Sequence, residues 1–320
     1  MKKDFYLLQY LERYGKPMES PSKYLRAKRP FIMGGMFVYN ESDIVEQTVL
    51  HMRAQEVPLV VIDNGSTDGT LEILRRHFGD PIVELLTVRT ELFELGLLLR
   101  TLHQALSKYG PRWILLLDAD ELLESPFPSM TIREAVEQED SNGYNLIQFN
   151  NFEFWPTEKD KDSSEPDVRK RIRYYSWNDC WQFKCFRNYP GTNIDEAGSH
   201  LPIFPSDVKV RLSPCRFIMR HYAIRSYAQG LRKVFAERLP RYPEHEKKKW
   251  GLRKYMNFGR EERYFIIDSS RLTRYNDDDH WVSERKFDGH RGYGFPSLTS
   301  SEEVEKEMEK YRRPIPAQNQ

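Results

Sequence analysis

The fold of this chain is constrained most by four apolar segments that alternate with stretches of helical periodicity. The segments lie at 31–38, 57–63, 81–88 and 112–123. Their near-continuous hydrophobicity is typical of strands that are buried on both faces of a sheet. Between the last two, apolar side chains recur at helical spacing, namely Leu95, Leu98, Leu99, Leu102, Ala105 and Leu106. The alternation predicts a doubly wound α/β fold whose mostly parallel sheet is covered by helices on both faces.

Polar residues end or follow each of these strands, and some of them are expected to cap the helices. We expect Asn40 or Ser42 to cap the helix after the first strand, and Ser66, Thr67 or Asp68 to cap the helix after the second. The carboxyl ends of parallel strands meet at one edge of a sheet, which is where such sheets bind ligands. The clusters YNES, DNGSTDGT, RTE and DADE are therefore expected to share one rim.

The composition argues against several classes of protein. Lys and Arg number 49 against 48 Asp and Glu, so the chain lacks the basic excess that would indicate nucleic acid as its main partner. No window approaches the roughly 20 apolar residues that span a bilayer, and the start of the chain lacks the features of a signal peptide. We therefore expect a cytoplasmic globular protein in which Cys180, Cys185 and Cys215 are reduced packing residues.

Two aspartates in the fourth segment form a candidate metal site. In an extended stretch Asp118 and Asp120 would project to the same side, with Glu121 adjacent, and their oxygens suit a hard divalent cation. A solvated strand end is the alternative. His221 follows another apolar run and is either a further metal ligand, since imidazole suits manganese, or a histidine bonded to nearby backbone.

Other side chains of the rim have two interpretations each. Asp63 ends the second strand, where its carboxylate either accepts hydrogen bonds from a nucleobase or ribose or opens a tight turn at Asn-Gly; Asp68 is similarly a contact or a cap. Glu41 either faces a nucleotide or complements a helix dipole. Arg100 either reaches a diphosphate or is solvated.

In combination these motifs resemble the nucleotide-sugar half of the family 2 glycosyltransferases, which have a GT-A fold. The resemblance rests on MFVYNESDIVEQTV, VVIDNGSTDGT and WILLLDADELL and covers about residues 31–124. The stretch RHYAIRSYAQGLRKVFAERLPRY is more loosely similar to the tail of some bacterial members. The resemblance implies a transferase that moves a sugar from a nucleoside diphosphate, with UDP as the family's usual carrier, to a hydroxyl of a glycan or glycoconjugate acceptor, with inversion.

The resemblance also implies roles for individual residues. Asp118 and Asp120 match the metal-binding D-x-D motif, which would hold Mn²⁺ or Mg²⁺, and His221 would be an extra ligand. The metal would neutralise the diphosphate and stabilise the departing nucleoside diphosphate. The residues that would contact the donor are Val38, Tyr39, Glu41, Asp63, Arg100, Asp118 and Ala119.

The general base that activates the acceptor hydroxyl has no clean match to the family. Inverting members use a carboxylate on the opposite face of the anomeric carbon. The segment NIDEAGSHLP offers Asp195 and Glu196, with His200 nearby, in a turn whose small residues suit a cleft loop. An ordinary acidic surface turn is the alternative, and Asp179 and Glu153 are further candidates.

The chain divides into four parts. Strand-like pieces after residue 125 predict a second, mixed sheet, and Ser226 with Gln229 predicts a capping box at the start of a helix. The expected parts are an N-terminal helical lead-in (1–28), a nucleotide-sugar-binding half (29–125), an acceptor-side half of the same domain (126–225) and a C-terminal helical extension (226–320).

The basic and aromatic stretch at 244–258 has two interpretations. It either contacts anionic lipid at the inner face of the membrane, or a lipid-linked acceptor, or it is a solvated helix face.

Two other functions stay open at this point. A nucleotidyltransferase would also use a doubly wound sheet and paired carboxylates, although it usually needs a glycine-rich basic loop after the first strand. In GGMFVYNES the glycines precede the end of the strand and no basic residue follows. A non-catalytic nucleotide- or carbohydrate-binding protein would keep the sheet without turnover, and the intact D-A-D sequence argues against it.

Overall fold

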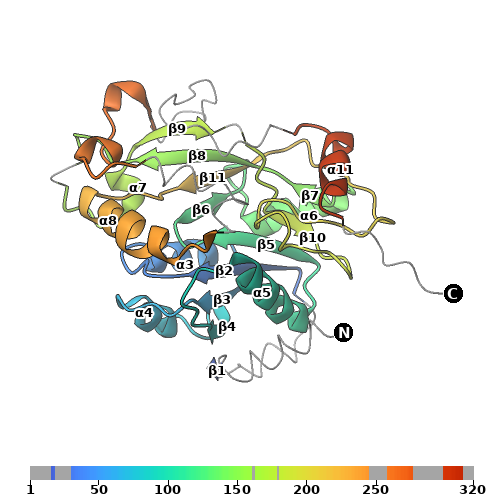
Figure 1. The fold of residues 1–320 in the computed structure, drawn as a ribbon. Coiled ribbons are helices and arrows are strands. Elements are labelled where there is room, and N and C mark those ends of the chain that lie inside the picture. Colours follow the sequence, from blue (N-terminus) through green and yellow to red (C-terminus); the bar gives the residue numbers. More distant parts are fainter. Residues whose placement is uncertain are drawn as a thin grey trace.

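A computed structural model describes residues 16–18, 30–160, 163–178, 180–244, 258–276 and 298–312 of the chain, and the structural statements below concern these residues. They form two sheets with helices packed around them (Figure 1). This arrangement confirms the expected α/β fold with a second, mixed sheet.

The first sheet has the strand order β1-β4-β3-β2-β5-β10-β7. Its centre is parallel and consists of β4 (Ile82–Thr87), β3 (Leu59–Asp63), β2 (Ile32–Val38) and β5 (Trp113–Asp118). The antiparallel edge strands are β1 (Lys16–Met18), β10 (Cys185–Arg187) and β7 (Leu146–Ile147). Strand β1 lies within the predicted helical lead-in, so residues 16–18 differ from that expectation.

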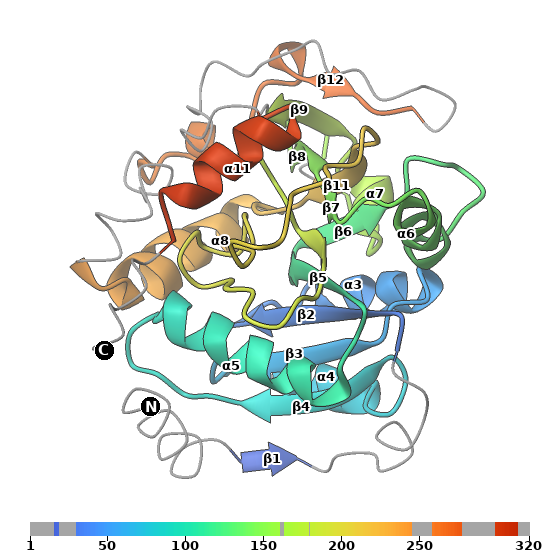
Figure 2. The same ribbon diagram turned by 90° about the vertical axis from the view of Figure 1, so that its right-hand side faces the viewer.

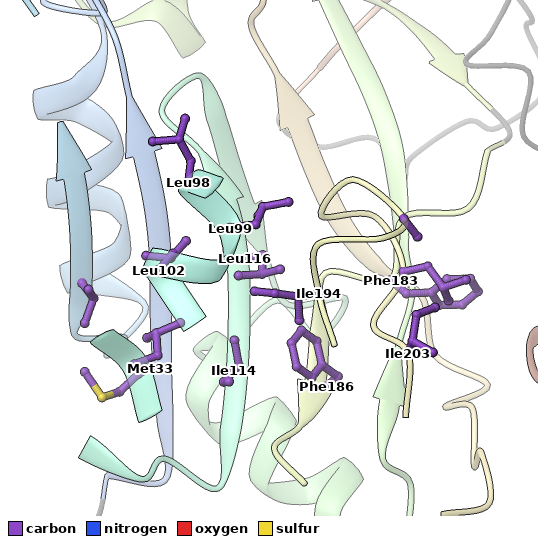
Figure 3. Packing of buried hydrophobic residues seen from close by; sticks show 14 of the residues in the cluster. Met33, Leu98, Leu99, Leu102, Ile114, Leu116, Phe183, Phe186, Ile194 and Ile203 are labelled. Atoms are coloured by element: carbon purple, nitrogen blue, oxygen red, sulfur yellow. The ribbon is translucent and has the colours of Figure 1, made fainter. Parts of the chain in front are cut away.

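Helices cover both faces of this sheet (Figure 2). Helix α5 (Leu95–Tyr109) packs its leucines on Met33, Ile114 and Leu116 of one face (Figure 3). Helices α3 (Val45–Ala54) and α4 (Thr70–Arg76) pack on the other face. The strands are therefore buried on both sides, which explains their near-continuous hydrophobicity.

The predicted caps of α3 and α4 are wrong in detail. Helix α3 begins at Val45 without a side-chain cap, because Asn40 and Ser42 lie in the preceding loop. Helix α4 begins after Gly69, whose φ of 95° suits glycine, although Asp68 does accept the N–H of Thr70 at 3.1 Å.

The second sheet has the strand order β12-β9-β8-β11-β6. Its strands are β6 (Glu121–Glu124), β8 (Phe149–Trp155), β9 (Tyr174–Asn178), β11 (Phe217–His221) and β12 (Thr273–Arg274). Strand β11 runs parallel to β8 and antiparallel to β6. The segment 112–123, predicted as one strand, is thus divided by a turn at 119–120 into β5 and β6, which belong to different sheets.

One helical segment contacts the loops at the ends of the first sheet's strands through its side chains. It comprises α8 (Tyr227–Leu231), the π-helical η1 (Arg232–Arg238) and the 3₁₀-helical η2 (Leu239–Arg241). We call residues 225–241 the rim segment; Figures 1 and 2 both place it between the levels of the two sheets. Ser226 caps α8 by accepting the N–H of Gln229 at 3.1 Å, as predicted, while the Gln229 side chain accepts the N–H of Arg225 instead of that of Ser226.

Short helices complete the described chain. They are α6 (Ile132–Ser141), α7 (Val168–Arg171), η3 (Glu262–Tyr264), η4 (Ser269–Arg271) and α11 (Ser301–Glu309). Among the described residues, no helix has the length and apolar character needed to cross a membrane. Most of the basic stretch 244–258 lies outside the described residues.

Candidate active site

The two aspartates of the D-A-D sequence sit on a turn between the two sheets. Asp118 ends β5 and is half-buried, whereas Asp120 is buried in the turn that leads to β6. The expectation of one extended stretch is wrong, because the chain turns at 119–120. The carboxylates of Asp118 and Asp120 nevertheless both lie near His221 and Lys184, whose pKa values they raise. The Asp118 N–H donates to Oε2 of Glu121 at 2.9 Å, which closes the turn.

A buried ion pair supports this turn. Lys184 Nζ lies 2.5 Å from both carboxylate oxygens of Glu121, and the two side chains are 1% and 3% exposed. Burial raises the pKa of Glu121, although Lys184 opposes the rise. Burial would lower the pKa of Lys184, but the carboxylates of Glu121, Asp118 and Asp120 together outweigh it and raise that pKa. The pair holds charge beneath the D-A-D turn without exposing it to solvent.

His221, at the end of β11, lies between the carboxylates of Asp120 and Glu153. The strand register places it opposite Glu121 of β6 and opposite Glu153 of β8. Its Nε2 is 3.7 Å from Asp120 Oδ1, and its Nδ1 is 4.0 Å from Glu153 Oε1. Burial would lower the pKa of His221, but Asp120 outweighs burial and raises it.

The facing atoms of Asp120 and His221 fit two ligands of one divalent cation. Their 3.7 Å separation exceeds a hydrogen bond. Two ligand atoms that each lie about 2.1 Å from a shared ion are roughly 3 to 4 Å apart. Nδ1 of His221 is buried without a hydrogen-bond partner in the described structure, which leaves the ring free to present Nε2. No group of three side chains suited to a metal comes together in the described parts of the chain.

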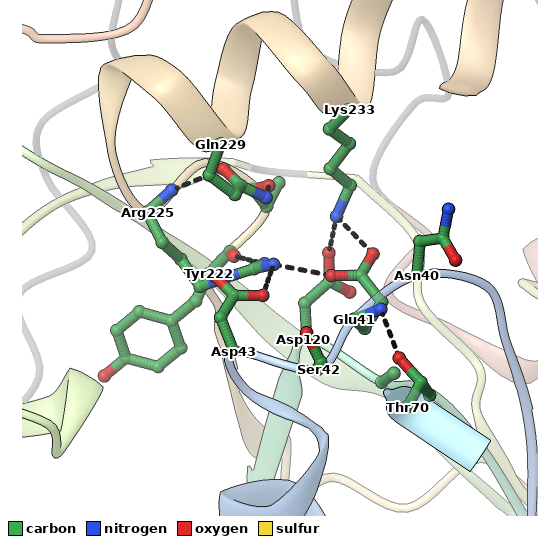
Figure 4. A network of polar contacts seen from close by, with 12 residues as sticks. Asn40, Glu41, Ser42, Asp43, Thr70, Asp120, Tyr222, Arg225, Gln229 and Lys233 are labelled. Carbon is green, nitrogen blue, oxygen red and sulfur yellow. Dashed lines mark hydrogen bonds and ion pairs between the residues drawn. The ribbon is translucent and has the colours of Figure 1, made fainter. Parts of the chain in front are cut away.

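Glu41 anchors a second buried cluster beside the turn (Figure 4). One of its oxygens accepts from Arg225 Nη2 at 2.6 Å, and the other lies 2.7 Å from Lys233 Nζ. Lys233 also donates to Asp120 Oδ2 at 2.7 Å. Arg225 additionally binds Asp43 through both carboxylate oxygens, at 2.7 and 2.8 Å. Burial would raise the pKa of Asp120, but Lys233 and His221 outweigh it and hold that pKa well below its usual range.

Asp63 opens the tight turn at Asn-Gly, which was one of the two roles predicted for it. The side chain is fully buried and accepts the N–H groups of Gly65 at 3.1 Å and Ser66 at 3.2 Å. Burial raises the pKa of Asp63. A contact with a nucleotide stays a prediction for this residue. Asp68 accepts the N–H of Ser42 at 3.1 Å and the hydroxyl of Thr70 at 2.6 Å.

The other expected donor contacts lie at the same rim. Val38 and Ala119 bury their side chains in the core next to the sheet, and their carbonyl oxygens accept from the Asn64 N–H at 2.8 Å and the Thr48 hydroxyl at 2.6 Å. The Tyr39 ring lies 3.8 Å from the guanidinium carbon of Arg241, which stacks over it. Arg241 also donates to Asn64 Oδ1 at 2.7 Å, so η2 is tied to the loop after β3.

The candidate bases lie in the loop between β10 and β11. Asp195 is buried and pairs with Arg100 of α5 at 2.5 Å. The sequence analysis gave these two residues separate roles, Arg100 as a donor contact and Asp195 as a candidate base. Glu196 is half-buried. Desolvation, and then Lys184 and His221, lower the pKa of His200 to about 3, so this histidine is neutral at physiological pH. Asp179 lies outside the described residues.

The sequence analysis assigned no role to three charged residues of this region, although two of them, Arg225 and Lys233, lie in the stretch that resembles the tail of bacterial members. Lys184, Arg225 and Lys233 are each about 1–3% exposed in their side chains, yet a lysine or arginine next to apolar residues normally indicates a solvated position. Glu153, a further candidate base, lies 4.0 Å from Nδ1 of His221 and accepts a hydrogen bond from Asn178 at 2.7 Å, and its role as a base stays a prediction.

Comparison with known proteins finds solved structures of low similarity and no curated relative. Among solved structures, the crystal structure of UDP-glucose pyrophosphorylase complexed with UDP-glucose is similar at 12% identity and a TM-score of 0.26, covering 60% of this chain and 90% of that chain. The apo form of a UDP-glucose pyrophosphorylase gives 11% identity, a TM-score of 0.25 and the same coverage. These scores carry no argument about function. No curated protein matches the chain.

The family comparison is decisive. The model for "Glycosyl transferase family 2" matches residues 35–206, more than half of the 320 residues, and this match takes in the central parallel strands, the D-A-D turn and the loop with Asp195. The chain therefore belongs to the family 2 glycosyltransferases.

Proposed function

We propose that this glycosyltransferase depends on a divalent cation, Mn²⁺ or Mg²⁺, and moves a sugar from a UDP-sugar to a hydroxyl of a glycan or glycoconjugate, with inversion. The observation that carries the proposal is the buried, facing pair of Asp120 Oδ1 and His221 Nε2, 3.7 Å apart at the carboxyl end of β5. This rim is the place where doubly wound sheets bind ligands.

Asp120 and His221 would hold the metal, with Asp118 beside them at the end of β5. Because no third side chain completes the set in the described residues, the remaining positions suit phosphate oxygens of the donor and water, as is usual for Mg²⁺. When bound, the cation would neutralise the diphosphate and stabilise the departing nucleoside diphosphate. Glu153 Oε1 lies 4.0 Å from Nδ1, the ring nitrogen that does not face Asp120.

The remaining residues would bind the donor or hold the D-A-D turn and the loops around it in place. Tyr39 and Asp63, at the ends of β2 and β3, border the proposed place of the base and ribose. The Glu121–Lys184 pair keeps the D-A-D turn in place. For the base we propose Asp195 or Glu196, in a loop that Arg100 ties to α5. Replacing each of these two carboxylates by its amide tests the assignment, since loss of the base lowers kcat more than the KM of the donor.

The first experiment measures nucleoside diphosphate release from a panel of sugar donors with acceptor and Mn²⁺. We expect turnover with a UDP-sugar and a loss of at least about a hundredfold in Asp120→Asn, because several kcal/mol of charge stabilisation would disappear. Asp167→Asn is the matched control, since Asp167 caps α7 and asparagine caps equally well. Unchanged activity of Asp120→Asn, or full activity in excess chelator, would contradict the metal role.

The same panel separates the alternatives. Release of pyrophosphate from a nucleoside triphosphate would favour a nucleotidyltransferase, and tight nucleotide binding without turnover on any donor would favour a binding protein. NMR of the product's anomeric proton tests inversion. Contact with the inner face of the membrane through 244–258 stays a prediction, tested by liposome co-sedimentation at low and high salt.

A further inference from the structure

The rim segment contacts the loops that follow β2, β3 and β5. Its polar contacts to them are Arg225 with Glu41, Lys233 with Asp120, Glu237 with Asn40, and Arg241 with Asn64. Several of these side chains converge in Figure 4. The segment therefore covers the rim at which the donor is proposed to bind.

Lys233 is the cation of this segment that bridges Glu41 and Asp120. Its side chain is 3% exposed, and its ammonium lies 2.7 Å from Asp120 Oδ2 and 2.7 Å from Glu41 Oε1. An ammonium group has three N–H donors. Two of them face these carboxylates, and the third has no acceptor among the residues that the structure describes.

The position of Lys233 next to Asp120 is what a phosphate ligand requires. His221 faces one oxygen of the Asp120 carboxylate, and Lys233 binds the other. A phosphate group held at the His221 side of this carboxylate would thus lie next to the Lys233 ammonium. Glu41 does not need Lys233 as its neutralising partner, since Arg225 already binds it at 2.6 Å and Arg238 lies 3.4 Å away.

The backbone around Lys233 is also unusual. Residues Arg232–Arg238 form a π-helix, a rare geometry that occurs most often as short insertions at functional sites. Within it, Lys233 and Glu237 both reach the rim, the first to Asp120 and the second to Asn40.

We propose that Lys233 is a donor-binding residue, which holds Asp120 in place and gives its third N–H to a phosphate oxygen of the nucleotide sugar. This inference rests on the proposed function. The competing explanation is that Lys233 only anchors the rim segment to the D-A-D turn.

The number of phosphates on the ligand separates the two explanations. The experiment measures the Kd of UDP, UMP and uridine, each with Mn²⁺ and again in excess chelator, for the wild type and for Lys233→Met by calorimetry, with GDP, GMP and guanosine as a second series. A direct contact of Lys233 with phosphate weakens the diphosphate in chelator too, whereas a loss that arises only from a displaced Asp120 is confined to the Mn²⁺ series and would overturn the inference. We expect Lys233→Met to weaken the nucleoside diphosphate by about tenfold to a hundredfold, the size of a lost charged hydrogen bond, and the nucleoside by less than about threefold. Lys108→Met is the matched control, because Lys108 forms a 2.7 Å ion pair with Glu84, between α5 and β4, and is expected to leave every Kd unchanged.

The possible outcomes differ in what they say about the proposed role of Lys233. Equal weakening of diphosphate and nucleoside, or no weakening of either, would leave Lys233 as an anchor and overturn the inference while the proposed function stands. A wild type that binds no nucleoside diphosphate would overturn both. If Lys233→Met does not fold, Lys233→Gln keeps a hydrogen-bond donor without the charge, and the same ratio of diphosphate to nucleoside affinity applies to it.

Discussion

Replacing Lys184 by methionine would leave the Glu121 carboxylate buried opposite an uncharged thioether. The two side chains are 1% and 3% exposed, so water cannot take the place of the ammonium without opening the turn. Breaking a buried pair from one side typically costs about 3 to 5 kcal/mol. Glu121 keeps one hydrogen bond, from the Asp118 N–H at 2.9 Å, so we expect a loss near the lower end, about 3 kcal/mol in the free energy of unfolding at pH 7.

The loss should depend on pH in a defined direction. Burial already raises the pKa of Glu121, and removing Lys184 raises it further. A carboxyl whose folded pKa is raised contributes stability that is fully present below its unfolded pKa, about 4.3, and that is lost as the pH rises through the folded pKa. The deficit of Lys184→Met relative to the wild type should therefore shrink between pH 8 and pH 5.

Denaturant unfolding of a double-mutant cycle measures this. Adding Glu121→Gln to Lys184→Met removes the unpaired charge, so the double variant should be more stable than the sum of the two single losses predicts, by about 2 kcal/mol. Additive losses, or a deficit that is the same at pH 5 and pH 8, would show that the pair does not carry the stability assigned to it.

Three further predictions concern the surroundings of the site. Gly230→Ala should lower Tm, because the added Cβ would lie 2.2 Å from Cδ1 of Phe265; a Tm equal to the wild type's would contradict this packing. Ser226→Ala should cost about 1 kcal/mol in denaturant unfolding, since α8 loses its cap, whereas Ser226→Asp should not. Burial would raise the pKa of Asp43, but Arg225 outweighs it and lowers the pKa, so Asp43 contributes stability above its unfolded pKa, about 3.9, that is lost as the pH falls. Unfolding of Asp43→Asn should therefore show a deficit at pH 7 that shrinks as the pH falls below about 3.9, and a deficit that stays constant over that fall would refute the assignment.

The parallel core was predictable because its physical cause is local. Strands such as β3 and β5 are buried on both faces, so nearly every residue in them is apolar, and α5 repeats its leucines on one side. The break between β5 and β6 was not predictable in the same way. The apolar residues on both sides of the D-A-D turn are buried, and hydrophobicity alone does not reveal that they lie in different sheets.

Helix caps and ion pairs depend on partners far along the chain. The Asn40 amide was expected at the start of α3, yet it binds Glu237, 197 positions away. Lys233 meets Asp120 across 113 positions, and Lys184 meets Glu121 across 63. The sequence identified the rim from the ends of the strands, whereas nothing in the spacing of the cations indicated which carboxylates they neutralise.

The D-A-D turn has a mechanical consequence. In the described chain only Ala119 and Asp120 separate β5 of the first sheet from β6 of the second, and only Gln148 separates β7 from β8 in the same way. Such short connections leave little room for a hinge between the sheets. The rim segment is instead held at the rim by side-chain contacts, so its displacement would uncover the proposed donor site without separating the two sheets.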